Sequence, residues 1–216
     1  ELDKILLSLL LKDNSSKENI IWATDNYAHL GEGYQAQQQI KESLITGNNG
    51  MVIRPRVAKT KEEQLSRVRE KAEVFTPSWV CNAQNNLVDD IWFGEKGVFN
   101  IEGDKKWTST VHQIVFPTSQ GKSWQDYVRD VRLEITCGEA PYLASRYDTI
   151  TGEPIDVRNR IGLLDRKLRV VSENTSTKED WLQWAKVAVQ SIYGFEWQGD
   201  SLLLARENVL YTFVDY

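Results

Sequence analysis

The chain has 216 residues, of which 41% are hydrophobic and 26% are charged, an ordinary balance that excludes wholesale disorder and collagen-like or mucin-like structure. With 26 Lys and Arg against 31 Asp and Glu, the net charge is −5, so any contact with nucleic acid has to come from a local basic patch. The two cysteines cannot build a disulfide framework, and the sequence shows neither a signal peptide nor an apolar run long enough to cross a bilayer. We therefore expect a cytoplasmic protein without membrane contact.

The N-terminal part predicts a small region of mixed helix and strand. Residues 2–12 are expected to form a helix, because leucines recur on one side of it. Residues 20–24 and 51–54 are predicted strands, and the Gly-Asn-Asn-Gly run at 47–50 is a strong turn signal. We assign residues 1–59 to an N-terminal α+β extension.

Residues 54–71 form the one clearly basic stretch, with seven Lys and Arg against three Glu. A helix is expected over 60–72, with Thr60 as N-cap and Glu63 at the capping-box position. One interpretation is a solvated helix with (i, i+4) ion pairs. The other is a strip that contacts DNA phosphates through Arg54, Arg56, Lys59, Lys61, Arg67 and Arg69.

The rest of the chain alternates predicted helices and strands, which indicates an α/β layer. Helices are expected at 77–92, 124–128, 141–147, 160–171, 178–192 and 202–216. Strands are expected at 97–102, 111–116, 132–136 and 193–196, the first two joined by a turn at 103–106.

Two of these strands end in an acidic segment beside a possible ligand crevice. Glu134 lies in the first and is followed by the turn Cys137-Gly138, where glycine lets a ligand approach the backbone. Glu196 ends the second and is followed by Trp197. At the carboxyl ends of parallel strands a carboxylate can accept hydrogen bonds from both ribose hydroxyls, and an indole can pack on a purine. The pattern indicates a nucleoside site, and the alternative is a purely structural glycine turn.

A Phe-Thr-Pro segment at 75–77 precedes the expected helix over 77–92. Thr76 suits an N-cap and Pro77 suits the first helical position, so local structure alone explains both. Phe75 is not explained in that way, and its ring belongs either to the core or to the wall of a pocket.

The order of these three segments resembles the N6-adenine DNA methyltransferases of bacterial restriction–modification systems, closest to modification subunits of the type I and fused restriction–methylase kind. The resemblance covers roughly residues 60–216. In that family the Phe-Thr-Pro segment is followed by a motif Asp-Pro-Ala-Cys-Gly-Ser/Thr-Gly-x-Phe-Leu, on which residues 134–143 fall in order. Cys137, Gly138 and Leu143 match, while Glu134 keeps the acid and Tyr142 the aromatic ring.

Two residues of this segment depart from the motif. Ile135 stands where the family has proline, and Ala140 stands where it has the second glycine. An alanine serves there only if its φ stays negative, and it narrows the approach to the cofactor.

The resemblance implies a partial Rossmann-like, S-adenosylmethionine-dependent methyltransferase domain over residues 60–216. Phe75, Thr76 and Pro77 would border the methionine moiety. Glu134, Cys137 and Gly138 would lie under the amino-acid end of the cofactor. Glu196 would hold the ribose, with Trp197 beside the purine. Because 58 positions separate Gly138 from Glu196, against about 30 residues in a simple βαβ unit, residues 148–190 must contain an insertion of one or two helices.

The catalytic tetrapeptide of that family, Asn/Asp-Pro-Pro-Tyr/Phe, is absent, because none of the five prolines is next to another. In the family it polarises the adenine amino group and stacks on the flipped base. We therefore expect the front part of a methyltransferase, inactive alone. Its expected partners are DNA, a specificity or restriction subunit, and a second copy bound through an incomplete sheet.

A non-catalytic DNA-binding or regulatory module derived from the same fold is the alternative, favoured by Ala140 and by the missing tetrapeptide. A metal site is not expected, because His29 and His112 are far apart and have no cysteine at ligand spacing.

Overall fold

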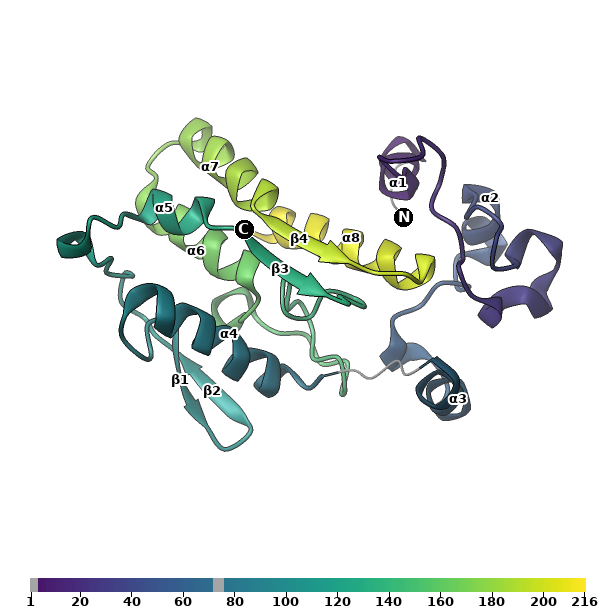
Figure 1. Cartoon of the computed structure of the whole chain (residues 1–216), viewed down its shortest axis with the longest axis horizontal. Coiled ribbons are helices and arrows are strands. Elements are labelled where there is room, and N and C mark those ends of the chain that lie inside the picture. The colour runs from purple at the N-terminus through teal and green to yellow at the C-terminus, as the bar shows by residue number, and fades with distance from the viewer. Residues whose placement is uncertain (1–3, 72–75) are drawn as a thin grey trace. The chain divides into compact units, whose positions relative to one another are not determined.

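The computed structural model describes residues 4–71 and 76–216 as a mixture of helix and sheet (Figure 1). The chain divides into two compact units. The first takes its described residues from Glu1–Glu73, Thr136–Glu139 and Phe195–Glu207, and the second from Val74–Ile135, Ala140–Gly194 and Asn208–Tyr216. A mixed α/β composition is thus confirmed, whereas the Rossmann-like topology stays a prediction.

The helices agree with most of the sequence-based expectations. They are α1 (Lys4–Leu11), α2 (Glu42–Ile45), α3 (Lys61–Lys71), α4 (Ser78–Phe93), α5 (Trp124–Arg129), α6 (Leu163–Asn174), α7 (Lys178–Gln190) and α8 (Gly199–Asp215). Short 3₁₀ turns lie at Asp25–Leu30, Glu32–Tyr34, Gly47–Asn49, Arg56–Ala58, Thr118–Gln120 and Val157–Asn159. The strands are β1 (Asn100–Gly103), β2 (Lys106–Ser109), β3 (Arg132–Ile135) and β4 (Ile192–Phe195). The two helices α6 and α7 lie between β3 and β4, so the presence of one or two helices within residues 148–190 is confirmed.

The first unit packs around the fully buried indole of Trp22. This ring lies 4.8 Å from Tyr27 and 5.4 Å from Tyr34, and its Nε1 donates a 3.0 Å hydrogen bond to the carbonyl of Gly33. The strand predicted over 20–24 is wrong, since this segment forms only an isolated bridge between Ile21 and Gln39. The strand predicted over 51–54 is also wrong, because the segment lies in a turn and a bend.

The N-terminus of α3 has the predicted capping box. The Thr60 amide donates to Glu63 Oε2 at 2.6 Å, and the Glu63 amide donates to Thr60 Oγ1 at 3.2 Å. Each side chain therefore satisfies a backbone donor of the other residue, which fixes where the helix begins.

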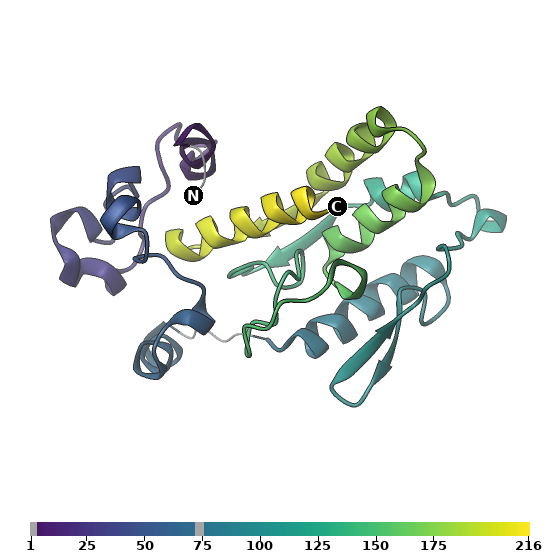
Figure 2. The same cartoon turned by 180° about the vertical axis from the view of Figure 1, so that it is seen from behind.

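The second unit packs α5, α6 and α7 around an aromatic cluster. Tyr127 of α5 is fully buried and contacts Trp92, Phe93 and Phe99 at ring distances of 5.1, 5.3 and 5.6 Å. Figures 1 and 2 show α6 and α7 beside each other in both views. Their facing residues are apolar and pack into this core, as the helical spacing predicts.

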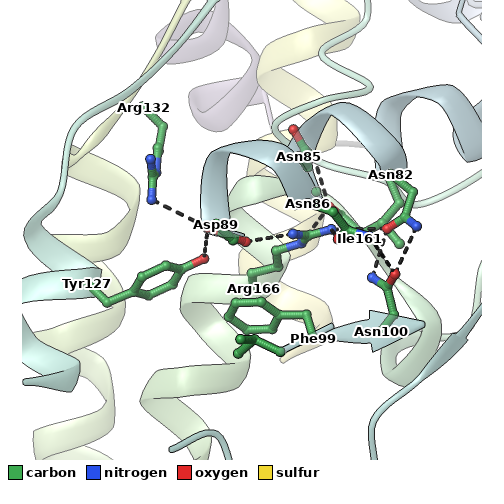
Figure 3. A network of polar contacts seen from close by, with 12 residues as sticks. Asn82, Asn85, Asn86, Asp89, Phe99, Asn100, Tyr127, Arg132, Ile161 and Arg166 are labelled. Atoms are coloured by element: carbon green, nitrogen blue, oxygen red, sulfur yellow. Dashed lines mark hydrogen bonds and ion pairs between the residues drawn. The ribbon is translucent and has the colours of Figure 1, made fainter. Parts of the chain in front are cut away.

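The buried side of α4 is largely polar. Besides Cys81 and Phe93, it carries Asn82, Asn85, Asn86 and Asp89, while Leu87 and Ile91 are exposed. This side is stable because its polar groups are paired (Figure 3). The side-chain amide of Asn85 donates to the backbone carbonyls of Tyr142 and Ile161 at 3.0 and 2.9 Å. The side-chain amides of Asn82 and Asn86 both donate to Asn100 Oδ1, at 2.9 and 3.0 Å.

The guanidinium of Arg166 lies at the centre of this network. It donates to Asp89 Oδ2 at 2.6 Å, to Asn82 Oδ1 at 3.0 Å and to Asn86 Oδ1 at 2.7 Å (Figure 3). The Tyr127 hydroxyl donates to the other Asp89 oxygen at 3.0 Å. Breaking such a buried pair is costly, because it leaves a charge without its partner in a medium of low dielectric constant.

The four strands form two small sheets. β1 and β2 make an antiparallel hairpin with Gly103 opposite Lys106, so the predicted turn is confirmed, but the second strand occupies 106–109 rather than 111–116. β3 and β4 pair side by side and point the same way (Figure 1). The Arg132 amide donates to the Ser191 carbonyl at 2.9 Å at the start of this pair. The helix predicted over 141–147 is wrong, because residues 141–143 form a turn and the rest of the segment is irregular up to a bridge at Tyr147.

We expect Arg166→Met to lower the free energy of unfolding by about 3–5 kcal/mol, because it leaves the Asp89 carboxylate and two asparagine carbonyls without their shared donor. Chemical denaturation followed by circular dichroism measures the change. Arg158→Met is the matched control, since Arg158 is exposed in the turn before α6. Equal stability of the two variants would contradict a central role for Arg166.

A second buried carboxylate, Asp165, makes the stability of this unit depend on pH. Its Oδ2 accepts hydrogen bonds from the amide and hydroxyl of Ser145 at 2.9 and 3.2 Å. Burial nevertheless raises the pKa of Asp165 to about 6. The folded state therefore binds a proton more tightly than the unfolded state, and the associated stability is present below pH 4 and lost as the pH rises through 6.

We expect the Asp165→Asn variant to lack this pH dependence. Relative to the variant, the wild-type chain should lose up to about 3 kcal/mol of unfolding free energy between pH 4 and pH 6, since one pKa unit corresponds to about 1.4 kcal/mol. Denaturant titrations of both proteins at half-unit pH steps measure the difference. Parallel curves would show that the Asp165 carboxyl does not titrate in this range.

Candidate functional site

The two segments that follow β3 and β4 lie side by side in the first unit. The Cys137 amide donates to the Phe195 carbonyl at 2.9 Å, and the Gly138 amide donates to Glu196 Oε2 at 2.8 Å. The predicted adjacency of the glycine turn and the acidic tip of the next strand is therefore confirmed. The role of these residues in binding a cofactor stays a prediction.

Glu196 acts as an acceptor for three backbone donors. Besides the Gly138 amide on Oε2, its Oε1 accepts from the amides of Trp197 and Gln198, each at 3.0 Å. A carboxylate offers about four acceptor positions, so about one remains for another donor. Glu196 thus joins the two strand ends and keeps limited capacity for a ligand hydroxyl.

The glycine turn is open above its backbone. Gly138 has a φ of +53°, in the left-handed region that favours glycine, and a Cβ built on it would meet no atom within 4 Å. The space that a side chain would occupy is therefore free, as the approach of a ligand to the backbone requires.

Ala140 adopts a left-handed backbone conformation. Its φ is +62°, so the negative φ expected for an alanine is not found. The side chain is buried, and the surrounding loop has to hold it in a region that costs an L-residue about 1–2 kcal/mol. The loop therefore holds an alanine in a backbone conformation that favours glycine.

The aromatic ring beside Glu196 is accessible. Trp197 is 74% exposed, so one face of its indole is free to stack on a flat ring. Cys137 and Glu139, in contrast, are buried, and Glu139 accepts a 2.7 Å hydrogen bond from the Arg56 amide. Cys137 lies under the turn rather than at its surface.

The other predicted cofactor residues belong to the second unit. Glu134 is buried and accepts a 3.4 Å hydrogen bond from the Tyr142 amide. The Thr76 carbonyl accepts from the Thr149 hydroxyl at 2.8 Å. Phe75 lies outside the described residues.

The start of α4 differs from the expected cap. Pro77 is its N-cap residue, and no side chain caps the helix from that position, so Thr76 does not have the N-cap role. Instead, the Ser78 amide donates to Asp148 Oδ2 at 3.1 Å.

The thiol of Cys81, one turn further along α4, is unreactive, because burial raises the pKa of Cys81 to about 12.

Two members of the basic stretch are buried ion-pair partners in the first unit. Lys59 Nζ lies 3.4 Å from Asp200 Oδ2, and the Lys59 side chain is only 4% exposed. Arg67 Nη2 lies 2.7 Å from the same oxygen, and the Arg67 side chain is only 7% exposed. Burial alone would raise the pKa of Asp200, but Arg67 and Lys59 outweigh it and hold that pKa below its usual value. Sequence reasoning missed Asp200, which looked like an ordinary acid in the first turn of α8.

The other basic residues are less enclosed. Arg54 forms an ion pair with Glu63 at 3.2 Å, and Lys61 is exposed. The backbone amide of Arg56 binds Glu139, as described above, and the side chain of Arg69 lies outside the described residues. Contact of this stretch with DNA stays a prediction, and Lys59 and Arg67 are first of all partners of Asp200.

Comparisons with models of protein families, with curated proteins and with solved structures find no match for this chain. Over residues 4–71 and 76–216, no helix combines the length and hydropathy that crossing a membrane requires. Within the same part of the chain, no group of three or more His, Cys, Asp and Glu side chains is arranged to hold a metal ion.

We expect Ala140→Gly to raise the free energy of unfolding by up to about 1 kcal/mol, because relief of the left-handed strain outweighs the extra freedom of glycine in the unfolded chain. Ala144→Gly is the matched control. Ala144 is also buried, but it is not among the residues with positive φ, so its substitution should destabilise. Denaturant unfolding of both variants measures the effect, and destabilisation by both would contradict the strain argument.

Proposed function

We propose that this chain carries the S-adenosylmethionine-binding part of a DNA adenine-N6 methyltransferase of a restriction–modification system. The observation that supports it most is the hydrogen bond from the Gly138 amide to Glu196, which brings an open glycine turn and an acidic strand end into one place. This is the arrangement in which α/β proteins bind nucleosides.

The residues present fit a nucleoside cofactor in part. The remaining acceptor position of Glu196 suits one ribose hydroxyl, and a grip on both hydroxyls requires the amide of Trp197 or Gln198 to release Oε1. The exposed indole of Trp197 suits an adenine face, and the open backbone at Gly138 admits the rest of the ligand. When bound, S-adenosylmethionine supplies the methyl group.

Transfer of that group to adenine requires a segment that these 216 residues lack. No two prolines are adjacent, so no Asn/Asp-Pro-Pro-Tyr/Phe sequence is present to polarise the adenine amino group. We expect no methylation of DNA by this chain alone. DNA, a specificity or restriction subunit, and a second copy joined through the small β3–β4 sheet remain its proposed partners.

A second candidate function is a non-catalytic DNA-binding or regulatory module of the same ancestry. It is favoured by the use of Glu196 as an acceptor for three backbone amides, which is a structural role, and by the alanine at the second glycine position. The two proposals differ in whether the chain binds S-adenosylmethionine.

Calorimetric titration with S-adenosylmethionine tests the first proposal. We expect Trp197→Ala to weaken binding about 10-fold or more, because stacking of a base on an aromatic ring contributes about 1–3 kcal/mol. Glu196→Gln should also weaken binding, since one of the two carboxylate oxygens becomes an NH2 group, so at least one backbone amide loses its acceptor and a ribose hydroxyl no longer meets a charge.

Trp107→Ala is the control for loss of a partly exposed indole, because Trp107 lies on β2, outside every segment predicted to bind the cofactor. It should leave the affinity unchanged, and circular dichroism checks that each variant is folded. No heat of binding with the wild-type chain, together with intact affinity for DNA, would overturn the first proposal and support the second.

A further inference from the structure

The segment that carries Glu196 is attached to the N-terminal part of the chain. We call residues 196–198 the Glu196 loop; it belongs to the first unit and leads directly into α8. The Gly199 amide, at the start of α8, donates to the Trp22 carbonyl at 3.3 Å. The side-chain amide of Asn26 donates to Gln198 Oε1, also at 3.3 Å, although these two residues are 172 positions apart in the sequence. The loop and its exit are therefore both bonded to the N-terminal segment of residues 21–26.

The start of α8 lies closer to this N-terminal segment than a side chain would allow. A Cβ built on Gly199 would lie 2.0 Å from the Ile21 carbonyl oxygen and 2.9 Å from Ile40 Cδ1, so any larger residue has to displace one of the two backbones. The next residue, Asp200, is buried and accepts a 2.8 Å hydrogen bond from the Tyr27 hydroxyl. The first turn of α8 is thus fixed in position by the N-terminal part of the chain.

The Glu196 loop supplies the hydrogen bonds that orient its own carboxylate. The amides of Trp197 and Gln198 both donate to Glu196 Oε1 at 3.0 Å, while the Gly138 amide donates to Oε2 at 2.8 Å. The direction in which the carboxylate points therefore depends on where the loop places its two amides. A group that is already oriented loses less conformational freedom when a ligand binds, so contacts that fix the loop favour binding.

We infer that the N-terminal segment of residues 21–26 positions Glu196 for its ligand, with Asn26 and Gly199 as positioning residues that act through the Glu196 loop. The inference rests on the proposed cofactor site, because it gives the N-terminal segment a role in that same site. Both residues act on the loop rather than on the ligand. The N-terminal extension is then part of the binding site and not a separate attachment to it.

Asn26→Ala is the most direct test, because it removes one side-chain hydrogen bond and leaves every contact of Gly199 in place. We expect the affinity of the full chain for S-adenosylmethionine to fall about 3- to 10-fold, the range that corresponds to one hydrogen bond. Since Asn26 acts through Gln198, Gln198→Ala should weaken binding to a similar extent. The variant with both substitutions should then bind no more weakly than the weaker single variant. Calorimetry measures the four affinities.

Asn49→Ala is the matched control. Asn49 belongs to the same unit and likewise donates one hydrogen bond from its side chain, to the Ser43 carbonyl at 3.1 Å, but it has no bond to the Glu196 loop. Its substitution should leave the affinity unchanged. A purely structural role of Asn26 would lower the free energy of unfolding without changing the affinity of the folded chain, so denaturant unfolding is measured on each variant as well.

Hydrogen exchange followed by mass spectrometry tests the positioning without any ligand. In Asn26→Ala, peptides that cover the Glu196 loop should exchange several-fold faster than in the wild-type chain, whereas peptides from the β1–β2 hairpin should be unchanged. Gly199→Ala should accelerate the same loop peptides further if circular dichroism shows that it is folded. Should it fail to fold, Asn26→Ala alone decides the question.

The outcomes separate this inference from the proposed function. If the wild-type chain binds no S-adenosylmethionine, the proposed function fails, and exchange in the Glu196 loop alone decides whether Asn26 positions it. Unchanged exchange of this loop in Asn26→Ala overturns the inference in either case. If the wild-type chain does bind, unchanged affinity in Asn26→Ala, or losses that simply add in the double variant, also overturns it.

Discussion

The carboxylate of Glu196 holds the ends of β3 and β4 together, and every argument about a cofactor depends on it. These segments are 58 positions apart in sequence, yet Gly138 donates to Glu196 at 2.8 Å. The bond has two consequences that oppose each other. It prepares the glycine turn and the acidic tip in one place before a ligand arrives, and it uses acceptor capacity that a ribose would need. One ligand hydroxyl can use the remaining acceptor position, whereas a second hydroxyl has to compete with a backbone amide.

The second unit depends on a polar interior that is fully connected. Arg166 lies against α4, where it pairs with Asp89 and with the amide oxygens of Asn82 and Asn86. Such a network stabilises one arrangement because any other leaves a buried charge without partners. The second unit is thus fixed by directional bonds as much as by the aromatic cluster around Tyr127.

The sequence predicted the elements whose signals are local. The helical periodicity of α6 and α7, the capping box of Thr60 and Glu63, and the turn at 103–106 are determined by neighbouring residues and are present in the structure. The predicted strand over 20–24 failed because its apolar side chains pack around Trp22 without a continuous ladder. The helix over 141–147 failed because Tyr142 and Leu143 give their carbonyls to the amides of Leu163 and Leu164, a distant pairing that no local pattern shows.

The candidate site was predicted in part for the same reason. The adjacency of Gly138 and Glu196 followed from the rule that parallel strands end at one edge of a sheet. The largely polar buried side of α4 was missed, although Asn82, Asn85, Asn86 and Asp89 recur at helical spacing, because a polar stripe usually faces water. Only the position of Arg166, 77 residues after Asp89, makes that stripe an interior one.

In both units a buried aspartate pairs with two cations and also accepts a tyrosine hydroxyl. This arrangement determines which basic residues are available to a ligand. In the first unit Asp200 lies between Arg67 and Lys59 and accepts the Tyr27 hydroxyl; in the second, Asp89 lies between Arg166 and Arg132 and accepts the Tyr127 hydroxyl. A cation held in this way gives its hydrogen bonds to the protein, and the partner carboxylate offsets much of its field. A count of Lys and Arg therefore overstates the capacity of residues 54–71 to contact phosphates directly. Arg54, paired at the surface with Glu63, exchanges a partner at the smallest cost, since an exposed ion pair contributes only about 0–1 kcal/mol.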